Sequence, residues 1–192
     1  MRAMGAKSNQ VRIIAGQWRG RKIGFPDIDG LRPTSDRIRE TLFNWLAPVL
    51  PGACCLDLFA GSGALGFEAA SRGAARVVMN ERNPLVVRAL QDSKARLAAD
   101  QVEVLGGDAR SCIANCVGPF DVVFLDPPFS QPHLLAEAAH LLARSNFLKD
   151  GAYIYVEAPS GADLGELPAG WQLYRRKQAG AVSYRLYRFQ SA

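Results

Sequence analysis

The segment from Phe120 to Phe129, FDVVFLDPPF, constrains the fold more than any other part of the chain. Its apolar run, Val122 to Leu125, has the length and composition of a strand that is buried on both faces of a parallel sheet. The run ends abruptly at the tetrapeptide DPPF. Proline fixes its own backbone, disfavours helix at the preceding residue and has no N–H group. The segment therefore predicts a buried parallel strand whose end is stiff, extended and rich in hydrogen-bond acceptors.

This strand end supplies one carboxylate, two proline carbonyls and one aromatic ring. Open α/β sheets bind ligands beyond the carboxyl ends of their strands. Such an end can accept hydrogen bonds from an amino group and stack on a planar ring, so we take Asp126, Pro127, Pro128 and Phe129 as candidate catalytic residues. The segment alone also fits a proline-rich loop that closes a sheet edge.

Strand and helix patterns alternate around this segment. The first expected strand of the sheet starts at Cys54, and the next four cover 76–81, 102–105, 122–125 and 153–157. The expected helices cover 36–46, 84–97, 109–116 and 132–144, and one more helix follows the glycine-rich turn and ends at about residue 72. Two further strands, 171–178 and 182–189, flank Ala179-Gly180 as a hairpin. This order predicts an α/β fold, a Rossmann-like, doubly wound, mostly parallel seven-stranded sheet with an antiparallel close.

Residues 61–66, GSGALG, match the glycine pattern of a nucleotide-binding loop, which is weak evidence alone. Here the loop follows a strand and opens a helix, and Glu81 ends the next strand about twenty residues on, where a ribose-binding acid is expected. Asp57 precedes the loop, and Asp108 follows the third strand. Asp108 could accept from an adenine amino group or merely cap the next helix, and both readings stay open.

The net positive charge is concentrated at the N-terminal end. Residues 1–50 hold nine basic and four acidic residues, an excess equal to the whole net charge of +5. The segment 11–25, VRIIAGQWRGRKIGF, has two short apolar pieces, 11–14 and 22–25, around glycines and Trp18, which predicts a hairpin or tight loop. Alternating arginine and aromatic side chains suit RNA, although Trp18 could equally fill a core and the charge could simply solvate the surface.

We expect residues 1–34 to form a basic, RNA-binding extension and residues 35–192 to form the catalytic domain. The expected RNA-binding residues are Arg12, Trp18, Arg19, Arg21, Lys22, Arg32, Thr34 and Arg37. The sequence shows no apolar run of membrane-spanning length and no secretory leader, and its four cysteines are expected to be core or free thiols, so we expect a cytoplasmic monomer without a metal.

Together, the glycine loop, the acids at successive strand ends and the DPPF tetrapeptide resemble class I S-adenosylmethionine-dependent methyltransferases that act on exocyclic amines. The residues 13–14, 16–22, 30–34, 37, 39–46 and 184–187 further resemble the RsmD family, bacterial 16S rRNA (guanine-N2)-methyltransferases. The resemblance covers nearly the whole chain. Ala15 stands where the family often has glycine, and Asn80 precedes the acid of the second strand.

The resemblance implies a role for each matched residue. The residues expected to bind S-adenosylmethionine are Asp57, Phe59, Gly61, Gly63, Glu81, Asp108 and Ala109. Asp57 and the two glycines would line the methionine end, Glu81 would hold the ribose hydroxyls, and Asp108 and Ala109 would contact the adenine. Asp126 and the Pro127 carbonyl would hold the target amine while Phe129 stacks on the guanine, in 16S rRNA within the small subunit or an assembly intermediate.

Four other functions share part of this pattern. A DNA or other RNA amino-methyltransferase acting on adenine N6 would share the site but not the N-terminal block. A protein glutamine methyltransferase usually carries asparagine where Asp126 stands. A dinucleotide dehydrogenase shares only the glycines, and a non-catalytic RNA-binding assembly factor would leave the intact site unexplained. The preference for guanine rests on the resemblance alone.

Overall fold

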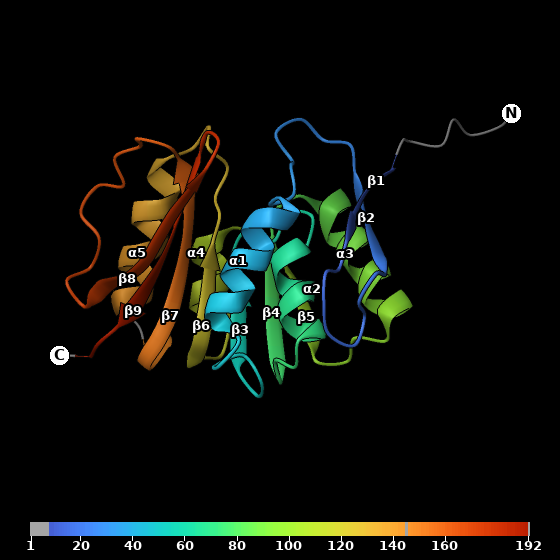
Figure 1. The fold of residues 1–192 in the computed structure, drawn as a ribbon, viewed down its shortest axis with the longest axis horizontal. Helices are drawn as coiled ribbons and strands as arrows, with labels where there is room; N and C mark the ends of the chain where they lie inside the picture. Colours follow the sequence, from blue (N-terminus) through green and yellow to red (C-terminus); the bar gives the residue numbers. More distant parts are fainter. Residues whose placement is uncertain (1–7, 145, 192) are drawn as a thin grey trace, which may run out of the picture.

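The computed structural model describes residues 8–144 and 146–191, and their arrangement is an α/β layered fold (Figure 1). The first half contains β1 (Ser8–Arg12), β2 (Lys22–Pro26), α1 (Asp36–Leu46), β3 (Cys54–Asp57), α2 (Ala64–Ser71), β4 (Arg76–Glu81) and α3 (Pro84–Leu97). The second half contains β5 (Val102–Gly106), α4 (Ala109–Asn115), β6 (Phe120–Leu125), α5 (His133–Arg144), β7 (Leu148–Pro159), β8 (Trp171–Ala179) and β9 (Val182–Phe189).

Seven strands form one sheet in the order β5-β4-β3-β6-β7-β9-β8. The first five of these are parallel, and β9 runs antiparallel to both β7 and β8. Strand order reverses at β3 and β6, so both strands lie in the middle of the sheet and their carboxyl ends border the crevice where such folds bind ligands. The predicted doubly wound sheet with an antiparallel close is confirmed.

Two apolar cores lie on the two faces of the sheet. One core joins α1, α2 and α3 to residues such as Cys55, Phe124 and Tyr155, and the other joins α4 and α5 to residues such as Leu125 and Ile154. Figure 1 views the molecule from the α1 and α2 side, with α4 and α5 behind the sheet. Strand β6 is buried on both faces, as its apolar run predicts.

Strands β1 and β2 pair antiparallel, which bears out the expected hairpin in residues 11–25, and Val11, Ile23 and Phe25 are buried in the core that also contains α3. The hairpin therefore shares a core with the domain that follows it. The boundary at residue 34 stays a prediction, and residues 1–7 of the extension lie outside the described part of the chain.

The largest departures from the predicted strand bounds occur in β1 and β7. The first strand was expected at 11–14 but ends at Arg12, because the amides of Ile14 and Ala15 donate to the carboxylate of Glu68 instead of to a strand. Strand β7 starts at Leu148 rather than 153, because Leu148 pairs with Phe120 before a shift of register at the start of β6. Within the described residues, no helix combines the length and apolar character needed to cross a bilayer.

Candidate active site

Four carboxylates lie at the carboxyl ends of four neighbouring strands. Asp57 ends β3, Glu81 ends β4, Asp108 follows β5 by two residues, and Asp126 follows β6 directly. Because these strands are parallel and adjacent, their ends share one edge of the sheet. The loop of residues 27–35 arches over the top of the molecule in Figure 1, and Leu31 from that loop approaches Gly61.

The glycine loop between β3 and α2 depends on the absence of side chains. Gly63 has φ 78° and precedes the first residue of α2, and a Cβ there would lie 2.6 Å from Leu90 and 2.8 Å from Phe67. At Gly66 a Cβ would lie 2.2 Å from the sulfur of Met79. The helix therefore packs directly on β4.

Asp57 is buried beneath this loop, and only one of its two carboxylate oxygens accepts a hydrogen bond from the described residues. Its Oδ2 accepts a hydrogen bond from the Gly66 amide at 3.0 Å, while Oδ1 has no hydrogen-bond partner among the described residues. Burial raises the pKa of Asp57 to about 7, and the Glu81 charge adds to this effect. A buried acceptor without a partner is costly, so this oxygen fits the ammonium group of an amino-acid ligand.

Glu81 holds the two loops that border the strand ends. Its Oε2 accepts from the Gly61 amide at 3.1 Å, and its Oε1 accepts from the Asn83 amide at 2.7 Å. The side chain remains partly exposed, so its remaining lone pairs can accept from vicinal hydroxyls. The expected ribose role fits this geometry and stays a prediction.

Asp108 caps α4. Its Oδ1 accepts from the Ser111 amide at 2.7 Å. This hydrogen bond, together with one from the Ser111 side chain, lowers the pKa of Asp108. The residue is exposed, and with Ala109 it borders a hollow of about 230 Å³ between α4 and α5. Phe59 is partly buried against the core on this side. The cap is present, and the adenine contact remains a prediction.

The DPPF tetrapeptide extends from β6 as the sequence indicates. Asp126 is partly exposed and Pro127 is buried, whereas Pro128 and Phe129 face solvent. The Phe129 ring is 44% exposed, which leaves a face free to stack on a planar group. Burial raises the pKa of Asp126 well above its ordinary value, and the nearby charges of Glu157 and Asp57 raise it further.

Glu157 is a site residue that the sequence analysis does not single out. Leu125 pairs with Val156 in the parallel ladder, so Asp126 and Glu157 follow at the same level of adjacent strands. The Tyr155 hydroxyl donates to Glu157 at 2.7 Å, and burial raises the pKa of Glu157. Its position at the end of a predicted strand, the pattern shared by the other acids, is the signal that could have revealed it.

Thr34 lies in the loop between β2 and α1, beside this pair of carboxyl groups. Its hydroxyl donates to Oδ2 of Asp126 at 3.3 Å, and the residue is buried. The sequence analysis assigns Thr34 to RNA contacts, whereas the structure places it beside the candidate catalytic carboxyl. A hydroxyl donor there stabilises the ionised form of Asp126 and partly offsets the effect of burial.

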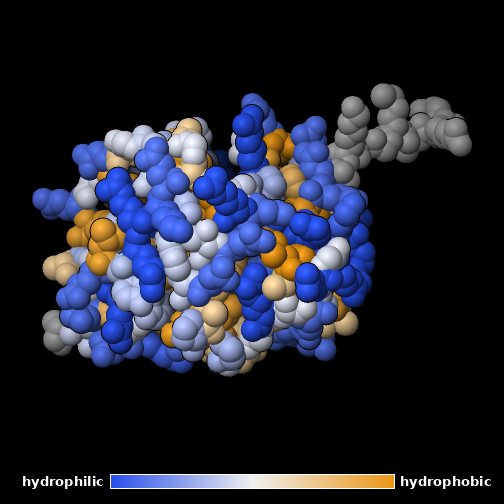
Figure 2. Space-filling view, in the orientation of Figure 1, coloured by the Kyte–Doolittle hydropathy of each residue, from blue (hydrophilic) through white to orange (hydrophobic). Residues whose placement is uncertain are grey.

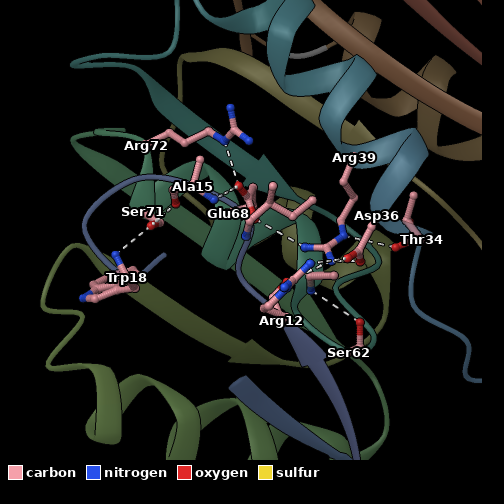
Figure 3. Close-up of polar contacts among 12 residues, drawn as sticks. Arg12, Ala15, Trp18, Thr34, Asp36, Arg39, Ser62, Glu68, Ser71 and Arg72 are labelled. Atoms are coloured by element: carbon pink, nitrogen blue, oxygen red, sulfur yellow. Dashed lines mark hydrogen bonds and ion pairs between the residues drawn. The ribbon is translucent and has the colours of Figure 1, made fainter. Parts of the chain in front are cut away.

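A buried network of charges holds Thr34 and the N-terminal segment in place (Figure 3). Arg39 of α1 and Glu68 of α2 are fully buried and pair at 3.3 Å. The Arg39 guanidinium also donates to the carbonyl of Thr34 at 3.1 Å and to the carbonyl of Arg12 at 2.9 Å. Glu68 accepts from two backbone amides, those of Ile14 and Ala15, and from Arg72. The network therefore ties the hairpin, α1 and α2 to the wall of the site.

The expected RNA-binding residues divide into exposed and buried groups. The exposed residues are Arg12, Arg19, Arg21, Lys22, Arg32 and Arg37. Arg12 pairs with Asp36 at 3.4 Å, and Arg21 donates to the carbonyl of Arg96 at 2.7 Å. Trp18 is only 7% exposed and its amide donates to Ser71, so the structure supports the alternative in which it fills the core.

Comparison with known proteins identifies the family. The sequence model of a family described as conserved hypothetical protein 95 matches residues 11–188. The Escherichia coli K12 protein named ribosomal RNA small subunit methyltransferase D is 52% identical over 180 residues, which cover 94% of this chain and 90% of that protein. The chain belongs to the RsmD family. The resemblance drawn from the N-terminal block and the DPPF tetrapeptide is confirmed.

Solved structures agree with membership of the RsmD family. The protein named "Putative methyltransferase yhhF from Escherichia coli" superposes with a TM-score of 0.89 and 48% identity, covering 96% of this chain and 100% of that chain. An RNA methyltransferase from Salinibacter ruber in complex with S-adenosyl-L-homocysteine has a TM-score of 0.64 at 22% identity, over 84% of this chain and 95% of that chain. This second likeness concerns the fold alone, which is that of class I methyltransferases.

Proposed function

We propose that this protein transfers a methyl group from S-adenosylmethionine to the exocyclic N2 amine of a guanine in 16S rRNA. One observation carries the proposal: the carboxyl group of Asp126, followed by two prolines and an exposed Phe129, lies on the same sheet edge as the glycine loop and the unpaired oxygen of Asp57. The named rRNA methyltransferase relative adds support for the substrate class.

The chain offers a suitable group for each part of the cofactor. Asp57 and the glycine loop would hold the methionine end, Glu81 the ribose hydroxyls, and Asp108 with Ala109 the adenine. Phe59 would line the same region. S-adenosylmethionine, when bound, supplies an electrophilic methyl group on a sulfonium. The orphaned Oδ1 of Asp57 is the feature of this chain that fits such a ligand best.

The target amine would be held by two acceptors. The lone pair of guanine N2 is delocalised into the ring, so the free amine is a poor nucleophile. The Asp126 carboxylate and the Pro127 carbonyl would each accept one N–H, which draws the nitrogen towards tetrahedral geometry and localises the lone pair. The proton lost on methylation would pass to Asp126 or to water, and accurate positioning would supply much of the rate.

Phe129 would compensate part of the cost of removing the base from its stack. Base flipping costs a few kcal/mol, and stacking on an aromatic side chain returns roughly 1–3 kcal/mol. The exposure of the ring after Pro128 supports this role. We also propose that the substrate is protein-bound or assembled small-subunit RNA, with Arg19, Arg21, Lys22 and Arg32 anchoring phosphates.

The test is methyl-label transfer to small subunits that lack the modification, with parallel reactions on naked 16S rRNA. The labelled nucleoside should co-migrate with N2-methylguanosine and map to one position. Asp126→Ala should retain binding of S-adenosylhomocysteine by calorimetry and lose turnover, whereas the exposed Asp100→Ala should behave as wild type. Label on adenine, or wild-type turnover by Asp126→Ala, would refute the assignment.

A further inference from the structure

Within residues 8–144 and 146–191, no helix covers the face of the sheet beyond α1. Figure 1 shows α1 and α2 in front of the middle strands, while β7, β9 and β8 have α5 only behind them. Strand β8 forms the edge of the sheet, and every residue from Gln172 to Gln178 is exposed. The stacking of Trp45 from α1 on Tyr184 of β9, at 5.6 Å between ring centroids, marks the limit of the covered region.

This edge is strongly basic. The stretch from Trp171 to Phe189 contains five basic residues and no acidic one: Arg175, Arg176, Lys177, Arg185 and Arg188. Within the described part of the chain, Arg175, Arg176 and Lys177 take part in no ion pair. In Figure 2 the region over these strands is mainly in hydrophilic colours, with a hydrophobic patch at its outer margin. Clustered, unpaired positive charge favours a polyanionic partner.

The register of the strands separates the basic side chains between the two faces. Arg175 pairs with Leu186 and Lys177 pairs with Tyr184, and both partners belong to the core on the α1 side. Arg176, which stands between them in the strand, pairs with Arg185. Because side chains alternate along a strand, Arg176 lies on the opposite face. The open face on the α1 side therefore carries Arg175 and Lys177 but not Arg176.

Aromatic rings accompany the two cations on the open face. Tyr174 is 48% exposed, and the Arg175 guanidinium lies 4.9 Å from its ring centroid. Tyr153 of β7, which packs against the core on the α1 side, contacts Tyr174 edge-on at 5.6 Å. Planar rings beside guanidinium and ammonium groups are the combination with which proteins bind unpaired nucleotides.

We propose that Tyr153, Tyr174, Arg175 and Lys177 form a platform that binds unpaired RNA next to the target base. This inference rests on the proposed rRNA methyltransferase function and adds a second recognition surface to the N-terminal one. Strand β8 runs parallel to β7, so the platform leads to the sheet edge that carries Asp126. In the strand order β6-β7-β9-β8, Tyr153 lies on the strand next to β6, and the three residues of β8 lie three strand spacings from β6, roughly 14 Å.

The test compares charge-matched variants from the two faces of one strand. Binding of a fluorescent, unpaired oligoribonucleotide would be measured by anisotropy over a series of salt concentrations, with a duplex RNA of equal length alongside. Arg175→Gln and Lys177→Gln should each weaken binding and reduce the salt slope by about 0.7. Tyr174→Ala should weaken binding roughly 5- to 150-fold, as expected for the loss of one stacked base.

Arg176→Gln is the control, because it removes the same charge from the opposite face. It should retain wild-type salt dependence and affinity for the unpaired RNA. Equal losses of RNA affinity from Arg175→Gln and Arg176→Gln would indicate that positive charge on either face attracts RNA equally, and would overturn the platform proposal. Unchanged binding by Tyr174→Ala would do the same, as would stronger effects on the duplex than on the unpaired RNA. Binding of S-adenosylhomocysteine and circular dichroism verify that each variant is folded.

Methyl transfer to small subunits distinguishes this proposal from the proposed function. Platform variants should raise KM for the subunit and leave kcat close to wild type. Absence of guanine methylation by the wild type would refute the proposed function, while face-specific RNA binding would survive. Wild-type KM in all three open-face variants would refute the platform and leave the function standing. A raised KM with unchanged binding of unpaired RNA would indicate a ribosomal protein contact instead and also refute the platform.

Discussion

The hydroxyl of Thr34 lies 3.3 Å from Oδ2 of Asp126, although 92 residues separate them in the chain. The N-terminal segment, which carries the exposed basic residues, therefore contributes a donor to the candidate catalytic carboxyl. Arg39 fixes this segment by donating to the Thr34 carbonyl. The proposed RNA contacts and the candidate catalytic carboxyl are thus connected through the packing of residues 8–39.

Thr34→Val should lower kcat for methyl transfer with little change in affinity for S-adenosylhomocysteine. Valine keeps the shape but removes the donor, so the ionised form of Asp126 loses a hydrogen bond that contributes about 1.5 kcal/mol, or roughly tenfold in rate. Thr41→Val is the matched control, because the Thr41 hydroxyl donates to the Arg37 carbonyl within α1. A wild-type kcat in Thr34→Val would contradict a positioning role for this hydroxyl.

Glu157→Gln should shift the pH dependence of kcat. Because the charge of Glu157 raises the pKa of Asp126, removing it should allow Asp126 to ionise at lower pH. The rising limb of the profile, which reports the coupled pair, should therefore move to lower pH. Glu103→Gln, an exposed residue of β5, should leave the limb in place. An unmoved limb in Glu157→Gln would show that the two carboxyl groups do not interact in the complex.

Binding of S-adenosylhomocysteine should release protons near neutral pH. Asp57 has a pKa of about 7 without a ligand, and the ligand ammonium would favour its ionised form. Affinity should therefore fall as the pH decreases below 7, by up to about tenfold per unit. Calorimetry in two buffers of different ionisation enthalpy measures the release. Asp57→Asn should bind weakly and without this pH dependence; proton release equal to wild type would point to another group.

The carboxyl group of Asp57 has the opposite pH effect on folding of the ligand-free protein, because it stabilises the folded state at low pH. The folded pKa of Asp57, about 7, is above its ordinary value of 3.8, so the folded state binds the proton more tightly than the unfolded chain does. The stabilisation is fully present below about pH 4 and is lost as the pH rises through 7. Denaturant unfolding at several pH values should show this loss, and Asp57→Asn should reduce it.

Glu68→Ala should destabilise the protein severely. The substitution leaves the Arg39 guanidinium buried without its carboxylate and the amides of Ile14 and Ala15 without an acceptor. Breaking a buried pair by removing one partner costs about 3–5 kcal/mol in the free energy of unfolding. Glu103→Ala, which removes the exposed pair with Arg76, should cost at most about 1 kcal/mol. Similar losses in the two variants would contradict a structural role for the buried network.

Gly16→Ala and Gly20→Ala should lower the unfolding free energy by different amounts although both glycines have similar φ angles. Gly16 has φ +83° and Gly20 has φ +81°, so both substitutions carry the cost of the left-handed region, about 1–2 kcal/mol. A Cβ at Gly16 would lie 1.9 Å from the carbonyl oxygen of Ser71, whereas one at Gly20 meets nothing within 4 Å. Gly16→Ala should therefore lower the unfolding free energy further and should disturb the hairpin; equal losses would contradict this packing.

The sequence predicts most of the sheet because apolar periodicity and turn residues are local signals. The glycine loop, the acids at the strand ends and the DPPF tetrapeptide all appear where those signals place them. The pairing of Thr34 with Asp126, and of Arg39 with Glu68, depends on how distant segments pack, which periodicity does not encode. Apolar periodicity assigns no partner to a charged residue within a helix, so the burial of Arg39 and Glu68 as a pair could not be inferred.

The hairpin of β1 and β2 has a consequence for how this protein can evolve. It shares its core with α3, and the hairpin and its connection to α1 supply the backbone groups of Arg12, Ile14 and Thr34 that bind Arg39 and Glu68. Exchange of this segment for another recognition module would leave buried charges without partners. The proposed RNA affinity can therefore change through exposed side chains such as Arg19 and Lys22, one substitution at a time, whereas recombination at residue 34 is disfavoured.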